Sequence, residues 1–204
     1  MASILKVDTI QDQSGNNIIN ENADTITIGA SGDTVNIVGT LQNNGSNAVG
    51  ITMADQWRLT ADTNIGTNAD ITTNWERNDS SGYASIGTGL TESSGIFSFP
   101  TTGIYLIILT ANFYIENGDA SCKIQLEITI DNSTFNIVFD ANGANSGGGV
   151  DTILNGNAQF VFDVTNTTTH KIKFSTNSFA ADTRARGNTS INETHFTVIR
   201  LGDT

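Results

Sequence analysis

Two histidines are the residues of this chain best suited to acid–base chemistry, but little around them supports a catalytic role. His195 precedes Phe196 in a strand-like segment, and His170 follows Thr-Asn-Thr-Thr-Thr, which is typical of a turn. A Ser-His-Asp triad needs one of them as its base, yet the sequence has no Gly-x-Ser-x-Gly nucleophile motif. The acidic residues are scattered, so no carboxylate pair for glycoside cleavage can be picked out. We expect no enzyme here, with a surface-polysaccharide depolymerase as the alternative.

Metal and sugar binding depend on a few other residues. The segment from Asp140 to Asp151, DANGANSGGGVD, has a carboxylate at each end, and calcium prefers oxygen ligands. It lacks the alternating acidic series and closing Glu of a helix-loop-helix calcium site, so a mobile glycine-rich loop is expected and no cofactor, with calcium the weaker alternative. Trp57 and Trp75 could stack on sugar rings, but a tryptophan beside a strand is more often core. Cys122 is the only cysteine and is expected to be a small buried hydrophobe.

Composition limits the partners and the fold class. The formal net charge is −12, so nucleic acid would be repelled, and nucleic-acid binding is not expected. We also expect no secretory signal peptide and no membrane insertion, since no apolar run is long enough. Hydrophobic residues make up 37% and charged residues 15%, and the remaining polarity comes from Asn, Thr, Ser and Gly. Those residues favour turns and strand edges, so an all-β fold is predicted.

Residues 1–50 differ in pattern from the rest of the chain. DTITIGASG, which begins at Asp24, is followed at once by DTVNIVGTL, and each copy reads as a short strand and a glycine turn. One such strand buries too little surface to be stable alone, so the repeats are expected to stack or to pair with neighbouring chains. A β-arm lying on its own domain is the alternative. The candidate docking or oligomerising residues are Ile4, Leu5, Val7, Ile10, Ile26, Ile28, Val35 and Ile37.

Residues 51–204 are predicted to form a compact antiparallel β-sandwich. The expected strands are QWRLTAD, GIFSFP, GIYLIILTANFYI, CKIQLEITID, TFNIVFDA, NAQFVFDV, HKIKFSTN and THFTVIRL. In KIQLEITI the side chains of Ile124, Leu126, Ile128 and Ile130 are expected to face one way, which indicates one buried and one wet face. IYLIIL does not alternate. A strand that is apolar on both faces is covered on both sides, and a neighbouring subunit would be one such cover.

The only proline, Pro100, marks a corner between two apolar segments. It has no N–H to donate and can end a strand, and Gly103 lets the backbone reverse. The residues expected to fill the core or a subunit seam around this corner are Phe97, Phe99, Pro100, Gly103, Tyr105 and Ile107.

The segment SSGIFSFPTTGIYLI resembles the Gly-x-Phe-x-x-Pro-x-x-Gly-x-Tyr signature of the complement component 1q-like globular head, a tumour-necrosis-factor-type jelly roll. NTSINETHFTVIRL is similar to the closing strand of that family, and the resemblance spans roughly residues 55–201. The resemblance implies a jelly-roll head that assembles as a homotrimer around a threefold axis. The collagen-like stem of the animal members is missing, and the repeats of residues 1–41 stand in its place.

The opening ILKVDTIQDQSGNNII is similar to the N-termini of bacteriophage tail and other virion proteins, particularly those of marine phages. The resemblances together imply a structural protein of a phage virion, a homotrimeric fibre or spike attached to tail or capsid. Residues 1–50 would dock onto other virion proteins or form a stem, and residues 51–204 would be the head. A host-surface glycan or protein is the candidate ligand, and a purely structural capsid decoration protein is a further alternative.

Overall fold

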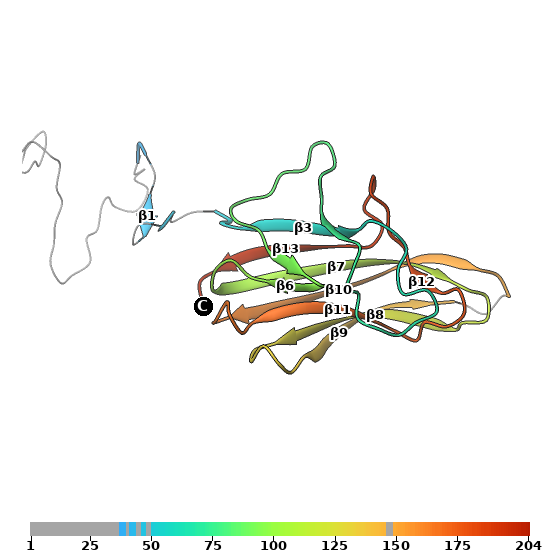
Figure 1. The fold of residues 1–204 in the computed structure, drawn as a ribbon. Coiled ribbons are helices and arrows are strands. Elements are labelled where there is room, and N and C mark those ends of the chain that lie inside the picture. The colour runs from blue at the N-terminus through green and yellow to red at the C-terminus, as the bar shows by residue number, and fades with distance from the viewer. Residues whose placement is uncertain (1–36, 40, 44–45, 48–49, 146–148) are drawn as a thin grey trace, which may run out of the picture. The chain divides into compact units, whose positions relative to one another are not determined.

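The structure is a computed structural model that describes residues 37–39, 41–43, 46–47, 50–145 and 149–204 (Figure 1). The chain divides into two units, residues 1–48 and 49–204, and each is described by itself. The described residues contain no helix, and therefore none with the length and apolarity that a membrane crossing requires.

In the first unit the structure describes a short antiparallel pair, β1 (Gln42–Asn43) with β2 (Ser46–Asn47). Ile37, one of the predicted docking residues, is 49% exposed. The other predicted docking residues lie outside the described residues: Ile4, Leu5, Val7, Ile10, Ile26, Ile28 and Val35.

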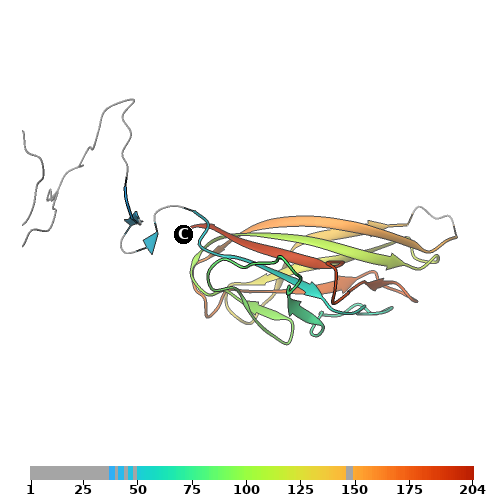
Figure 2. The same ribbon diagram turned by 90° about the horizontal axis from the view of Figure 1, so that it is seen from above.

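The second unit is a sandwich of two antiparallel sheets. The six-stranded sheet has the order β10-β7-β13-β3-β4, with β12 also paired to β7. Its strands are β3 (Ala54–Leu59), β4 (Trp75–Arg77), β7 (Gly103–Ile115), β10 (Thr152–Val164), β12 (Arg184–Ala185) and β13 (His195–Gly202). The five-stranded sheet has the order β5-β6-β11-β8-β9. Its strands are β5 (Thr91–Ser93), β6 (Ile96–Ser98), β8 (Ser121–Thr129), β9 (Asn136–Ala144) and β11 (Lys171–Asn177). In Figures 1 and 2 the axes of the long strands of both sheets are roughly aligned.

The all-β class and all eight expected strands are confirmed. β4, β5 and β12 are additions, each of two or three residues. The expected glycine-rich loop from Asp140 is wrong in its first part, because β9 continues through Ala144. The alternation expected in KIQLEITI holds for Ile124 and Leu126, which are fully buried, and β8 ends at Thr129, which leaves Ile130 62% exposed.

Aromatic rings from both sheets fill the middle of the core. The ring of Phe97 lies edge-on to Trp57 at 5.2 Å, to Trp75 at 5.6 Å and to Phe196 at 4.8 Å between centroids. Such edge-to-face pairs add stabilisation beyond the apolar area that they bury. Trp57 therefore has the core position that was expected of it, and Trp75 is partly buried against the core.

The corner at Pro100 joins the two sheets. β6 ends just before it in the five-stranded sheet, and β7 begins just after it in the six-stranded sheet. Gly103 has a φ of 147°, and a Cβ there would lie 2.6 Å from the carbonyl oxygen of Gly202. The Tyr105 hydroxyl donates to the Thr101 carbonyl at 2.8 Å, which closes the corner from inside. Glycine is required at position 103 for both its conformation and its lack of a side chain.

Candidate functional site

β7 is apolar on both faces, and the sandwich buries only one of them. Its residues alternate between buried and half-buried along all 13 positions. The buried set is Gly103, Tyr105, Ile107, Leu109, Ala111, Phe113 and Ile115. The half-buried set begins with Ile104, Leu106 and Ile108, which belong to the face of the sheet that the sandwich leaves open. We call this the outer face of the six-stranded sheet.

An apolar row crosses the outer face near the end of the sheet at which β3 begins and β13 ends. Val161 of β10 is paired with Leu106 of β7, Leu106 with Ile199 of β13, and Ile199 with Ala54 of β3. We call these four residues the apolar row. Val161 is 54% exposed, and the other three residues of the row are half-buried. A contiguous apolar patch on a protein surface is a candidate interaction surface.

The outer face becomes polar toward its other end. Thr110 of β7 donates to Asn157 of β10 at 2.9 Å, and Asn112 donates to Asn155 at 2.6 Å. Among the described residues, β10 with its 13 residues is the last strand of this sheet and pairs with β7 alone. Edge strands invite pairing or covering by another chain. The outer face thus offers an apolar half and a hydrogen-bonding half beside one open edge.

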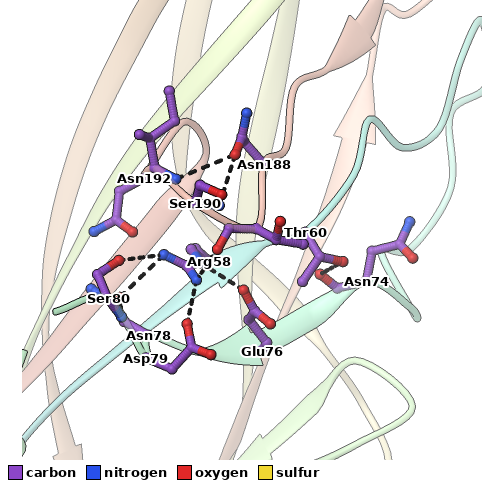
Figure 3. A network of polar contacts seen from close by, with 12 residues as sticks. Arg58, Thr60, Asn74, Glu76, Asn78, Asp79, Ser80, Asn188, Ser190 and Asn192 are labelled. Atoms are coloured by element: carbon purple, nitrogen blue, oxygen red, sulfur yellow. Dashed lines mark hydrogen bonds and ion pairs between the residues drawn. The ribbon is translucent and has the colours of Figure 1, made fainter.

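On β3 the outer face carries a buried network of polar side chains around Arg58 (Figure 3). The Arg58 side chain is fully buried and donates to Glu76 at 2.7 Å and to Asp79 at 2.6 Å. Two loops cover it: residues 78–90, between β4 and β5, and residues 186–194, between β12 and β13. Figure 1 shows both loops projecting from the same side of the head. A buried arginine is stable only when its donors are paired, and these loops supply the partners.

The opposite side of β3 holds a second buried charge, Asp55. Its side chain is fully buried and accepts from Arg77 Nε at 2.9 Å, Trp57 Nε1 at 2.9 Å and the Leu90 backbone N–H at 2.8 Å. The Tyr83 hydroxyl also donates to it at 3.0 Å. Burial raises the pKa of Tyr83, and the nearby Asp55 carboxylate adds to the increase. Asp55 therefore anchors both ends of the 78–90 loop to the sandwich.

The sequence-predicted residues around the corner lie mainly in the core. Phe97, Tyr105 and Ile107 are fully buried, and Phe99 is 4% exposed. Pro100 is half-buried at the corner and does not belong to the apolar row. The side chains that face outward are the alternate residues of β7, which the sequence identified only as part of a two-sided strand.

The two histidines lie in different surroundings. His170 is 8% exposed, its two ring nitrogens contact the hydroxyls of Thr165 at 3.1 Å and Thr169 at 3.0 Å, and its ring stacks on Phe162. His195 is half-buried on β13, with Nδ1 3.1 Å from the carbonyl oxygen of Glu193. Each histidine is thus engaged by the local fold, on a different strand or turn.

The candidate calcium segment is divided between different partners. Asp140 accepts from Lys123 at 3.0 Å and from Gln125 at 2.8 Å, whereas Asp151 accepts from Tyr114 and from the backbone N–H of Asn117. Within the part of the chain that the structure describes, no three His, Cys, Asp or Glu residues are grouped so that they could hold a metal ion. Burial raises the pKa of Cys122 to about 12, which keeps the thiol protonated.

The order of strands and the comparison with solved structures agree on the architecture. Eiger, a tumour necrosis factor from S. frugiperda, is similar with a TM-score of 0.56 at 12% identity, over 76% of this chain and 95% of that one. The fold is a tumour-necrosis-factor-like jelly roll. Murine APRIL resembles this TNF-like head with a TM-score of 0.51 at 14% identity, over 73% of this chain and 98% of that one. No protein-family model and no curated protein sequence matches the chain.

The TNF-like head fits the corner signature from which the resemblance was drawn. Identities of this size show the fold alone, so the function of the head has to be argued from its own surfaces. Among those surfaces, the sequence did not reveal Gln56, Arg58 and Asp55 as members of buried networks. Their only signal was a pair of charges inside ADQWRL, which an alternating strand also shows when it has a wet face.

Proposed function

We propose that the chain is a structural protein of a bacteriophage virion, a homotrimeric fibre or spike whose TNF-like head acts by binding. In this proposal the outer face of the six-stranded sheet forms the seam between copies. Residues 1–50 dock onto other virion proteins of the tail or capsid. The protein is located in the virion after synthesis in the host cytoplasm, and it needs no cofactor and performs no catalysis.

The observation that carries the assembly is the apolar row of Ala54, Leu106, Val161 and Ile199. These side chains come from four adjacent strands and face away from the sandwich core. A second copy is the occupant that we propose, because association of like copies is the commonest form of assembly. The four side chains of the row carry no charge of their own. Symmetric assembly would also cover the open edge of β10.

The virion role is supported by the opening ILKVDTIQDQSGNNII, which is similar to the N-termini of phage tail and other virion proteins. The nine-residue repeats that follow are suited to pairing with the same segment of neighbouring chains. β3 and β13 pair so that Ala54 lies opposite Ile199, and the head therefore begins and ends at the same end. A docked N-terminal segment would leave the loops at the other end accessible.

Host attachment would be the use of such an accessible head. Three weak sites on one trimer raise avidity by orders of magnitude without any new contact. A glycan or protein of the host surface is the proposed ligand class. Antibodies against the head that block adsorption would support this step, and unimpaired adsorption at saturating antibody would reject it.

The assembly is tested by light scattering on the full chain. We expect three times the chain mass of 21.6 kDa for the wild type and a monomer for Leu106→Asp. Ile137→Asp is the matched control, because Ile137 is 55% exposed on β9 of the other sheet. A monomeric wild type rejects the trimer. A trimer that tolerates Leu106→Asp would show that the seam lies elsewhere.

The location is tested by immunogold labelling of intact phage particles with antibodies against residues 51–204. Gold on the tail or its fibres supports receptor binding, and gold over the capsid supports a head fibre or decoration protein. Particles without gold, prepared from a lysate that contains the protein, would contradict a place in the virion.

A further inference from the structure

The two loops that cover Arg58 are built in the same way. In the 78–90 loop, the Asn78 side-chain oxygen accepts from the Ser80 backbone N–H at 2.9 Å. In the 186–194 loop, the Asn188 side-chain oxygen accepts from the backbone N–H groups of Ser190 at 2.7 Å and Ile191 at 3.3 Å. An asparagine that bonds the backbone two residues later forms a tight local turn. Each loop therefore has a defined shape of its own at the point where it meets β3.

Arg58 binds both loops with one guanidinium group. Toward the 78–90 loop, Nη1 donates to Asn78 at 3.2 Å and to Ser80 at 2.6 Å, and Nη2 donates to Asp79 at 2.6 Å. Toward the 186–194 loop, Nη2 also donates to the backbone carbonyl of Thr189. The guanidinium is planar and fixes its partners in one plane. Because the Arg58 side chain is fully buried, losing either loop would leave donors unpaired.

Gln56 makes a second bridge one outward position before Arg58 on β3. Its side-chain oxygen accepts from Asn78 at 2.7 Å and from Asn192 at 2.7 Å, so it too joins the two loops. Its amide nitrogen donates to Thr197 of β13 at 2.8 Å, which fixes the orientation of the amide. The Asn192 side-chain oxygen is buried without a hydrogen-bond partner among the described residues. Asn192 is thus held by this one bridge at the cost of an unpaired acceptor.

We propose that Gln56 and Arg58 couple the 78–90 and 186–194 loops into one conformational unit. A change that loosens one loop then loosens the other, although the coupling residues belong to a strand between them. The coupling has an energetic basis, because opening one loop removes partners from side chains that the second loop needs. A ligand that binds and orders one loop would therefore also order the other loop. The two loop surfaces would then be energetically coupled.

Hydrogen exchange on the full chain tests the coupling. Asn78→Ala alters a side chain of the 78–90 loop, which contacts Ser80 in that loop and the coupling residues Arg58 and Gln56 on β3. We expect backbone exchange in residues 187–193 to become at least about fivefold faster, although no altered atom lies there. Ser85→Ala is the matched control, an exposed residue of the same loop. The exchange of β8 in the other sheet reports any global loss of stability.

The reciprocal variant is Asn192→Ala, with residues 78–83 as the readout. Faster exchange in the unaltered loop in both variants, with β8 and the Ser85→Ala control unchanged, supports the coupling. Faster exchange confined to the altered loop overturns it. If Asn78→Ala also accelerates exchange in β8, the exchange of residues 78–83 and of β8 in Asn192→Ala decides between coupling of the loops and a global loss of stability. Neither result depends on whether the chain forms trimers at the apolar row, because the loops can be compared in the Leu106→Asp background.

Discussion

The two faces of β7 have the same kinds of side chain and different environments. Tyr105, Ile107 and Leu109 are fully buried between the sheets, whereas Leu106 and Ile108 between them are half-buried on the outer face. A single sandwich needs only the first set. The second set would add exposed apolar surface without a benefit to folding, unless another chain covers it. The difference therefore supports the proposal that a second chain covers the outer face of the strand.

The largest expected effect separates the two faces directly. Ile107→Ala removes buried methyl groups and leaves a cavity, so we expect the free energy of unfolding to fall by about 4 kcal/mol. Leu106→Ala should cost less, and its cost should depend on protein concentration, because contacts between chains add stability by mass action. Urea unfolding of both full-length variants at several concentrations measures this. If both variants lost the same free energy of unfolding at every protein concentration, the two faces of β7 would not differ in the way proposed.

β3 extends the comparison to charges, with Asp55 on the core side. Asp55→Asn keeps the shape but removes the charge that pairs with Arg77, and the new amide N–H₂ would face donors. We expect the free energy of unfolding to fall by about 3 kcal/mol, near the lower end for breaking a buried pair, because Arg77 is 42% exposed and can be hydrated. Asp182→Asn, at an exposed position just before β12, is the control. A loss no larger than that of the control would show that Asp55 is not an anchor.

The start of β7 provides a smaller test, since Gly103 is where the chain leaves the corner. Gly103→Ala places a Cβ 2.4 Å from Arg200 Nε and 2.6 Å from the Gly202 carbonyl oxygen, at a φ of 147°. We expect a loss of about 2 kcal/mol in the free energy of unfolding. A Cβ at Gly202 would meet nothing within 4 Å, so Gly202→Ala is the matched control. Equal melting temperatures for the two variants would contradict the strain.

Apolar strand formers and turn residues were sufficient to predict the long strands. GIYLIILTANFYI buries alternate residues although its apolar residues do not alternate, whereas KIQLEITI alternates and buries Gln125 together with Ile124 and Leu126. The strand-forming residues of both segments are written locally in the sequence. The corner was predictable for the same reason, since proline and glycine each impose a backbone conformation. β4, β5 and β12 were missed because two or three residues are too few to show a period.

The polar networks could not be predicted, because their partners are distant in sequence. Arg58 looks like a residue of a wet face until loops from residues 78–80 and 188–192 cover it. Which loop covers which strand is decided by the topology of the sheets and not by local pattern. The identity of a covering subunit on the outer face is not written locally either. The two-sided strand predicted that a cover exists, and the register of four strands locates the apolar row that it would meet.

The smallest expected effect contrasts an exposed aspartate with the buried Asp55. Asp131, in the turn after β8, accepts from the backbone N–H groups of Thr134 and Ser133, each at 2.8 Å, and from the Thr129 hydroxyl at 2.9 Å. These bonds, the one from Thr134 first, lower the pKa of Asp131 well below its usual value. A carboxyl whose pKa is lower in the folded state stabilises the fold above its unfolded pKa. That stabilisation is lost as the pH falls through the folded value.

Asp131→Asn should therefore lower stability at neutral pH, and the difference from the wild type should shrink as the pH falls below about 4, the usual pKa of an aspartate. Urea midpoints of both proteins measured from about pH 6 to about pH 2 give this difference. Asp182→Asn, at an exposed position just before β12, is the control for the removal of one carboxylate. A difference between the wild type and Asp131→Asn that stays constant over the whole range would mean that the turn depends on the shape of the side chain and not on its charge. The exposed aspartate would then stabilise its turn much as an asparagine does, and only buried Asp55 would need its charge.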